Sequence, residues 1–188
     1  MVLIVEPRDI ESFVYHSNAI EGAPVDSDSP WVTKHLAGVH QVIADALLGT
    51  LTPPETLHEI LFAGLSPIGD NAGAWREVLV RVGDDIPPSP DDLPRLMTRW
   101  WSSVSKAAQD EREHLSLDKA WFYHNAFECI HPFIDGNGRV GRLILNQLAL
   151  LSDNPWVTIY EPKKQLYYQK IIRFRHTEWP AVYARWMK

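Results

Sequence analysis

The 188-residue chain has a single cysteine, no long apolar run and no excess of positive charge. Cys129 cannot form an intramolecular disulfide, and its apolar surroundings predict a small buried residue in a reducing compartment. The apolar run after Met1 lasts four residues before Glu6 and Pro7, which is too short for a signal peptide or a membrane span. We therefore expect a cytoplasmic protein.

The charge balance disfavours whole classes of partner. With 24 acidic and 18 basic residues the formal net charge is −6, so the chain lacks the general basic surface that nucleic acids or anionic membranes require. We expect neither as a partner, and a phosphate ligand would have to be bound by local geometry. A length of 188 residues with 45% hydrophobic content suffices for one good core and is short for two, which predicts a single domain.

Apolar residues recur at helical spacing through most of the chain, which predicts a mainly α protein. The apolar stripe is clearest between Pro30 and Gly49. Further helices are predicted from a capping box at Thr52 through Leu61, from Asp91 through Val104, over Asp118 to Ile130, from Asn137 or Gly138 through Leu151, and from Lys163 to Lys188 with an interruption before Pro180. The helix that ends at Leu151 is apolar on most sides, so we expect it to be central.

One segment departs from helical spacing. Trp75 to Gly83 alternates apolar and charged residues at Val80, Arg81 and Val82, and it ends in Gly-Asp-Asp before prolines. This pattern predicts a short β-hairpin or edge strand, which must lie against the helices because an isolated hairpin is only marginally stable. An ordinary surface hairpin is one interpretation of it.

The residues best suited to chemistry are concentrated in one short run. It combines a titratable base, a carboxylate, three glycines and two arginines: His131-Pro132-Phe133-Ile134-Asp135-Gly136-Asn137-Gly138-Arg139-Val140-Gly141-Arg142. A base with a pKa near neutrality can take a proton from a hydroxyl, and a carboxylate can hold a hard cation that also bridges phosphates. Glycine backbone N–H groups and arginines bind phosphate oxygens. The run therefore predicts a site for a nucleotide polyphosphate.

A competing interpretation comes from the same glycines, because Gly136-x-Gly138-x-x-Gly141 also fits the dinucleotide fingerprint. That fingerprint requires a preceding strand inside a βαβ unit. Here the segment before His131 has a helical pattern, and no alternation of strands and helices follows. The missing context disfavours a dinucleotide-binding fold.

The run resembles the active-site motif of Fic-domain proteins, H-P-F-x-D-G-N-G-R-x-x-R, and matches every fixed position. The resemblance implies a compact Fic-type helical bundle with a β-hairpin flap, here Val80, Arg81, Val82 and Gly83, that covers the active site and docks the target. It also implies that His131 deprotonates a Ser, Thr or Tyr hydroxyl of a target protein. That hydroxyl attacks the α-phosphate of ATP, so that AMP stays on the target and pyrophosphate leaves.

The same resemblance assigns roles to the rest of the motif. Asp135 would bind Mg²⁺, the turn of Gly136, Asn137 and Gly138 would hold the α- and β-phosphates, and Arg139 and Arg142 would contact the β- and γ-phosphates. Judged without the motif, these residues have ordinary interpretations. His131 and Asp135 would cap helix ends, and the arginines would be solvated surface residues.

Two further features bear on the nucleotide. Gly138 stands where relatives that act as kinases carry lysine, which favours adenylyl transfer. Tyr167 and Tyr168 resemble an aromatic pair that lines the adenine pocket in the family, although two helical tyrosines can equally serve packing. Phe174 and Arg175 stand where relatives often have asparagine, so the nucleotide preference stays open.

An N-terminal segment resembles the Fic inhibitory motif, [S/T]-x-x-x-E-[G/N], in Ser17-Asn18-Ala19-Ile20-Glu21-Gly22. This implies an inhibitory helix region at residues 1–29, followed by the Fic core at 30–188. Glu21 would pair with Arg142 and occupy the guanidinium meant for the γ-phosphate, while Ser17 would help to fix the helix. On the alternative interpretation, Gly22 simply ends a helix.

The sequence thus leads us to expect an autoinhibited protein adenylyltransferase that uses ATP and Mg²⁺, modifies a target protein and itself, and could also remove AMP. A catalytically idle nucleotide-binding regulatory module is the alternative. The sequence leaves the target open, and it is compatible with a homo-oligomer.

Overall fold

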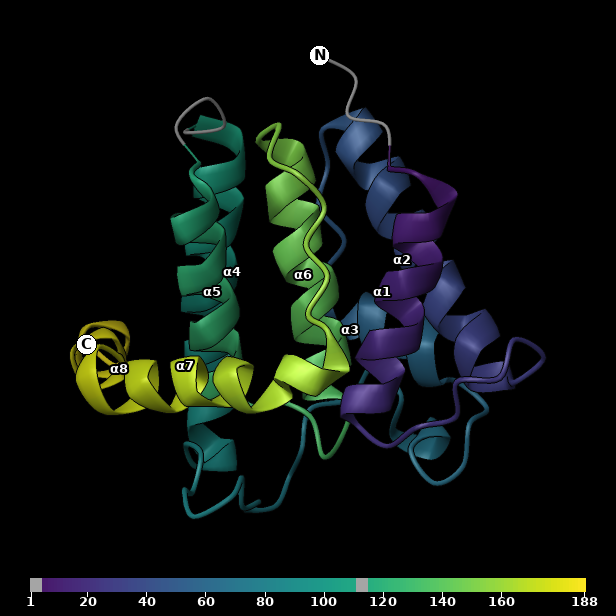
Figure 1. Ribbon diagram of the computed structural model, residues 1–188. Coiled ribbons are helices and arrows are strands. Elements are labelled where there is room, and N and C mark those ends of the chain that lie inside the picture. Colours follow the sequence, from purple (N-terminus) through teal and green to yellow (C-terminus); the bar gives the residue numbers. More distant parts are fainter. Residues whose placement is uncertain (1–4, 111–114) are drawn as a thin grey trace.

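The computed structural model describes residues 5–110 and 115–188 (Figure 1). The helices of the described residues are α1 (Pro7–Ile20), α2 (Pro30–Leu48), α3 (Pro54–Phe62), α4 (Leu93–Asp110), α5 (Leu117–Ile130), α6 (Asn137–Leu151), α7 (Lys164–Thr177) and α8 (Trp179–Trp186). Short 3₁₀ turns cover residues 69–71, 90–92 and 161–163, and these described parts contain no regular β-strand. The predicted mainly α fold class is confirmed.

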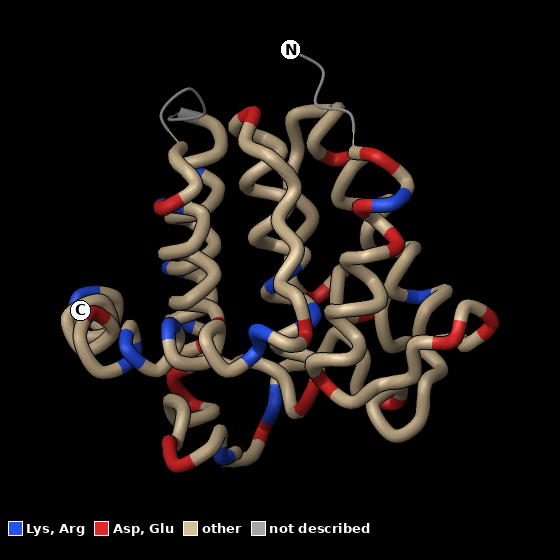
Figure 2. Tube along the Cα trace, in the orientation of Figure 1, with Lys and Arg blue, Asp and Glu red and all other residues tan. Residues whose placement is uncertain are grey.

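The central helix is α6, as its apolar sequence predicts. It lies between the pair α4 and α5 on one side and the group α1, α2 and α3 on the other (Figure 1). All of its residues except Gly138 are buried. Its only charged residues, Arg139 and Arg142, lie near its N-terminal end, and most of the helix carries no charge in Figure 2. Two charges are therefore buried at one end of an otherwise uncharged helix.

Helix boundaries follow local sequence signals. Proline occupies the first turn of α1, α2, α3 and α8, where its missing N–H costs no intrahelical bond. The Ser29 side chain accepts a hydrogen bond from the Trp31 N–H at the start of α2, and Gly49, with φ of 71°, ends that helix. The break between α7 and α8 falls before Pro180, as predicted.

The predicted capping box at Thr52 is wrong. Pro53 occupies the N-cap of α3 and no side chain caps this helix. The Thr52 hydroxyl instead donates to the buried carboxylate of Asp45, which also accepts from Gln147 Nε2 at 2.8 Å. A buried carboxylate needs such donors, so Thr52 fastens the connection after α2 back onto that helix rather than starting α3, and Gln147 joins the same carboxylate to the central helix.

The predicted β-hairpin is reduced to one antiparallel bridge, in which the Val82 and Asp85 backbones pair at 2.9 and 3.2 Å. Gly83, with φ of 61°, allows the tight turn between them. The rest of the segment forms no ladder because the Arg76 side chain joins its two ends, through hydrogen bonds to Val78 O at 3.0 Å and Pro88 O at 2.5 Å.

The N-terminal helix α1 belongs to the same helical body, since Phe13 and Val14 are part of the hydrophobic core. The C-terminal end of α1, the N-terminal end of α6 and the start of α7 meet at the lower end of the bundle in Figure 1. Of the helices described, none has the length and apolar character needed to cross a bilayer.

A prediction follows from the close packing of α2 on the bundle at Gly38. A Cβ atom at this position would lie 2.9 Å from Leu143 Cδ1 and 3.0 Å from Leu61 Cδ1. We expect Gly38→Leu to destabilise the protein by about 1–3 kcal/mol, because the added side chain overpacks a filled core. Urea denaturation measures the effect. Ala37→Leu, on the exposed face of α2, is the control, and equal stability of both variants would contradict the packing described.

Candidate active site

The loop between α5 and α6 begins at His131, which has φ of 52° and ψ of 62°. This left-handed geometry is uncommon for a residue other than glycine and turns the chain out of α5. The loop ends at Gly136, with φ of 81°, where a Cβ atom would overlap the Phe62 ring. The backbone therefore accepts only glycine at position 136. At the start of the loop, the left-handed conformation of His131 sets the direction of its side chain.

Two polar side chains brace this loop. Asn137 is 2% exposed, accepts from the Phe133 N–H at 3.0 Å and donates to Phe133 O at 2.9 Å. His58 Nδ1 accepts from the Gly73 N–H at 2.9 Å, so Nε2 carries the proton and donates to Asp135 O at 3.1 Å. Burial lowers the pKa of His58 to about 4, which keeps this tautomer neutral. The sequence gave no indication that His58 would bind this loop. Asn137 belongs to the motif, and its side chain braces the loop.

The first turn of α6 has backbone N–H groups without backbone acceptors. The N–H groups of Asn137, Gly138 and Arg139 have no backbone acceptor among the described residues, and Val140 is the first whose N–H is paired, with Gly136 O at 3.1 Å. Such a turn favours an anion.

Arg139 adds further unused donors beside this turn. Its side chain is almost fully buried, with the guanidinium 4.5 Å from the Phe62 ring centre and 5.0 Å from that of Trp31. Its Nε and Nη1 have no hydrogen-bond partner, and its nearest carboxylate, Asp135 Oδ1, is 3.8 Å from Nη2. Burial lowers the pKa of Arg139. Buried donors without acceptors are costly, so this geometry suits a bound anion.

The structure brings Ser17, Glu21 and Arg142 together. Arg142 is 1% exposed, and its Nη2 lies 2.8 Å from Glu21 Oε1. Its Nε donates to Ser17 Oγ at 2.8 Å and its Nη2 to Ser17 O at 2.9 Å. Burial by itself would lower the pKa of Arg142, but the charge and hydrogen bond of Glu21, together with Tyr167 and Glu128, outweigh it and the pKa is raised. Arg142 is therefore held in its charged form by α1.

The Glu21 carboxylate occupies the place where an external anion would approach α6. A Cβ atom on Gly138 would overlap Glu21 Oε1 and lie 3.0 Å from Arg142 Nη1. Gly138 thus lets the carboxylate come close to the first turn, whose N–H groups lack backbone acceptors. Gly22, with φ of 67°, then turns the chain away after α1.

His131 is neutral at physiological pH. Burial lowers the pKa of its ring to about 4, and the charges of Arg175 and Arg76 act in the same direction. A neutral imidazole can accept a proton, which is what a general base requires.

Arg76 anchors the backbone around His131, and the sequence gave no indication of it. Its Nε donates to His131 O at 2.8 Å, its Nη2 lies 3.5 Å from Ile130 O, and its own N–H donates to Pro132 O at 2.8 Å. The side chain is almost fully buried. Because the same guanidinium also binds Val78 O, it connects the predicted flap with the loop that carries His131.

The two tyrosines have different environments. Tyr167 is 5% exposed, and its hydroxyl lies 3.0 Å from His124 Nε2. Its ring packs behind Arg142, with the guanidinium 5.8 Å from the ring centre, so Tyr167 serves packing at this place. Tyr168 is partly exposed beside it, with ring centres 5.5 Å apart.

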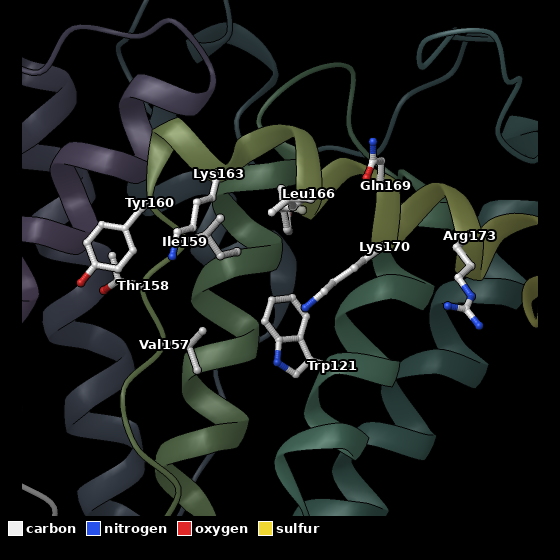
Figure 3. A pocket seen from close by; sticks show the side chains of 11 residues that line it. Trp121, Val157, Thr158, Ile159, Tyr160, Lys163, Leu166, Gln169, Lys170 and Arg173 are labelled. Atoms are coloured by element: carbon white, nitrogen blue, oxygen red, sulfur yellow. The ribbon is translucent and has the colours of Figure 1, made fainter.

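A groove of about 620 Å³ runs along another side of α7 (Figure 3). It is bounded by Trp121 of α5 and by the extended segment 157–160, and Lys163 and Lys170 lie at its edges. Tyr167 contributes to its wall, but His131 and the α5–α6 loop do not.

Glu128 is a buried acid that the motif does not contain. It is 7% exposed, its Oε1 has no hydrogen-bond partner, and a Cβ atom on Gly141 would overlap that oxygen. Burial raises the pKa of Glu128 to about 7, although the charge of Arg142 opposes this. The glycine at position 141 therefore makes room for a carboxyl group directly behind Arg142.

Asp135 fits the role of a lone carboxylate ligand. Its side chain is 57% exposed, and its Oδ1 accepts from the Gly136 N–H at 2.5 Å, which leaves Oδ2 free. The described residues contain no group of three metal-binding side chains. Magnesium often takes one or two carboxylates and completes its shell with phosphates and water, so this donor set is compatible with a metal that arrives with a nucleotide.

Glu128 predicts an unusual pH dependence of stability. Its folded pKa lies above the ordinary value of 4.5, so the folded state binds more protons and stability falls as pH rises through about 7. Glu128→Gln removes this loss of stability. We therefore expect the difference in free energy of unfolding, variant minus wild type, to be larger at pH 8 than at pH 5 by about 1–3 kcal/mol. Urea denaturation at both pH values measures the difference.

The histidines with lowered pKa act in the opposite direction, since they favour folding as pH rises toward 6.5. They are present in both proteins, so they cancel in the comparison. Glu11→Gln, at an exposed position of α1, is the matched control. A Glu128→Gln variant that follows wild type at every pH would contradict the raised pKa.

Relatives among curated proteins align with most of this chain. It is 32% identical over 152 residues to the Protein adenylyltransferase Fic of Drosophila grimshawi, which covers 80% of this chain and 31% of that protein. The protein of the same name from Drosophila mojavensis is also 32% identical over 152 residues, covering 80% and 30%. The chain therefore spans less than a third of the length of these relatives.

Solved structures share the fold. A Fic domain containing signaling protein from Bacteroides thetaiotaomicron gives a TM-score of 0.71 at 21% identity, covering 89% of this chain and 75% of that one. Fic-1 from C. elegans gives 0.67 at 20% identity, covering 98% and 60%. Residues 55–149, slightly more than half of the sequence and including the α5–α6 loop, match the Fic/DOC family. The chain belongs to the Fic/DOC family.

Proposed function

We propose that this chain is a protein adenylyltransferase, restrained by its own α1, that transfers AMP from ATP to a Ser, Thr or Tyr hydroxyl of a target protein. One observation carries the proposal: a neutral His131 begins the short loop that leads into α6, and the first turn of α6 and the Arg139 side chain both have hydrogen-bond donors without partners. The names of the curated relatives support the same activity.

The proposed reaction uses these groups in a fixed order. The first turn of α6 and Arg139 bind the polyphosphate and neutralise its charge. His131 accepts the proton of the target hydroxyl as the oxygen attacks the α-phosphorus of ATP. The bond from the α-phosphorus to the bridging oxygen breaks, pyrophosphate leaves with that oxygen, and the target carries AMP. Glycine at position 138 leaves space for the phosphates.

Asp135 would hold Mg²⁺, and the metal would supply charge neutralisation for the phosphates. The flap segment, residues 77–87, would present the target. Three of its apolar side chains, Val78, Leu79 and Ile86, are 53–66% exposed, which suits a docking surface for a polypeptide. Tyr168 would contact the base.

Inhibition in this proposal is competition between two anions for one site. Glu21 binds Arg142 and lies against the first turn of α6, where a γ-phosphate would otherwise be bound. ATP that binds while Glu21 stays in place cannot engage Arg142, so its α-phosphate is not aligned for attack. The same carboxylate could position a water molecule for removal of AMP.

An idle nucleotide-binding regulator is the second candidate, because Nε and Nη2 of Arg142 are bound by Ser17 and Glu21 in this structure. ATP binding without any transfer, even after Glu21 is removed, would favour that role. Incubation of the Glu21→Gly protein with α-labelled ATP and Mg²⁺, followed by mass spectrometry of the labelled side chain, distinguishes the two.

His131→Ala tests the proposed base. His131 faces the target hydroxyl in the proposal rather than phosphate, so we expect loss of label transfer by a factor of about 10² or more with ATP affinity nearly unchanged. Transfer is measured in the Glu21→Gly background, and ATP binding by calorimetry. Exposed His40→Ala on α2 is the control. Substantial residual transfer would remove His131 from this role.

Glu21→Gly tests the proposed inhibition. Removal of the carboxylate frees Arg142 for the γ-phosphate, so we expect label incorporation to rise by about tenfold or more, since Arg142 gains a charge-assisted contact with ATP. Arg142→Ala in the same background should reverse the gain. Any AMP-removing activity should fall in the single variant. Equal incorporation by wild type and Glu21→Gly under identical Mg²⁺ would contradict inhibition.

A further inference from the structure

The turn of the flap segment is fastened to α7 by an ion pair. Arg175 Nη1 lies 2.8 Å from Asp85 Oδ2, and the two side chains are 12% and 29% exposed. The residues are 90 positions apart in the sequence, so the pair joins two separate parts of the fold. His176 is a more distant neighbour, with Nε2 3.9 Å from Asp85 Oδ1.

The flap segment is held at two points. At its base, the Arg76 guanidinium binds the carbonyl groups of Val78 and Pro88, which lie near the two ends of the segment. At its turn, the Asp85 side chain binds Arg175. Loss of the second contact would leave the base attached and release the turn.

Arg175 also acts on His131 through its charge. Among the charged groups it makes the largest contribution to lowering the pKa of His131, after burial. Arg76 acts in the same direction, while the Glu21 carboxylate and the Glu128 backbone act in the opposite one. The guanidinium of Arg175 therefore binds the flap turn and also lowers the pKa of His131, the proposed base.

We propose that Arg175 is a positioning residue for the transfer reaction, because its ion pair with Asp85 holds the flap turn beside His131. The inference rests on the proposed function of His131 as the base. A target segment that lies along a fixed flap presents its hydroxyl at a defined distance from the imidazole, and alignment of this kind is a large part of the rate. Arg175 acts through Asp85 and His131 rather than on the phosphates.

The experiment separates this role from a merely structural one. Arg175→Gln and Asp85→Asn each remove the ion pair, Arg175→Lys keeps a charge, and Arg173→Gln is a matched control at an exposed position of the same helix. Hydrogen exchange of residues 77–87 and an NMR titration of His131 are measured on the unliganded protein. Self-labelling from α-labelled ATP is measured in the Glu21→Gly background, with kcat and the KM for ATP determined separately.

We expect exchange in the flap segment to rise by about tenfold in Arg175→Gln and in Asp85→Asn, while α5 and α6 keep their protection. The pKa of His131 should rise by up to about one unit in Arg175→Gln and much less in Arg175→Lys. The value of kcat should fall by about tenfold, because the hydroxyl is less well aligned, with the KM for ATP unchanged. Arg173→Gln should match the parent protein throughout.

The reversed pair, Arg175→Asp with Asp85→Arg, should restore slow exchange in the flap segment. Unchanged exchange in both single variants would overturn the proposal, as would a general rise in exchange across α5, α6 and α7, which indicates a structural role only. If the Glu21→Gly protein shows no transfer at all, the proposed function fails. The exchange and the His131 titration then still decide whether Arg175 holds the flap turn.

Discussion

Arg142 places a guanidinium that is 1% exposed at the N-terminal end of the central helix, where the helix dipole already disfavours positive charge. A buried cation without a counterion costs several kcal/mol, so the site must contain an anion. Glu21 supplies it, and its carboxylate also faces a helical turn whose N–H groups lack backbone acceptors. An entering polyphosphate would satisfy the same groups, which makes the resting contact and the proposed substrate site mutually exclusive.

A second constraint is the rigidity of the loop that carries His131. The backbone of this loop is bound by side chains that take no part in the proposed chemistry: Asn137, His58 and Arg76. His131 itself has a left-handed conformation that would not persist without such support. Arg76 extends the same support to the flap, because one guanidinium binds carbonyl groups in both segments. The loop that carries His131 and the predicted flap are thus connected by hydrogen bonds to the same side chain.

Much of this could be predicted from the sequence, for local reasons. Helix positions followed from apolar spacing and from proline and glycine at the ends, and the motif from His131 to Arg142 indicated the family. The Thr52 capping box was wrong because a buried carboxylate on another helix took its hydroxyl. The hairpin shrank to one bridge because the Arg76 side chain replaced a backbone ladder. Both differences arise from side-chain hydrogen bonds, with separations of 2 to 12 positions in the sequence, that spacing patterns of apolar and charged residues do not encode.

The sequence by itself determined which groups are available: a base, a carboxylate, a glycine-rich turn and two arginines within one short run, and a glutamate near the N-terminus. Only the tertiary structure decided their states. Burial keeps His131 neutral and leaves Arg139 with unused donors, and the packing of α1 on α6 gives Arg142 to Glu21. The resemblance of Ser17 to Gly22 to an inhibitory motif implied the pair of Glu21 and Arg142, but the protonation of His131 and the unused donors of Arg139 depend on solvent exclusion, which no local pattern of residues encodes.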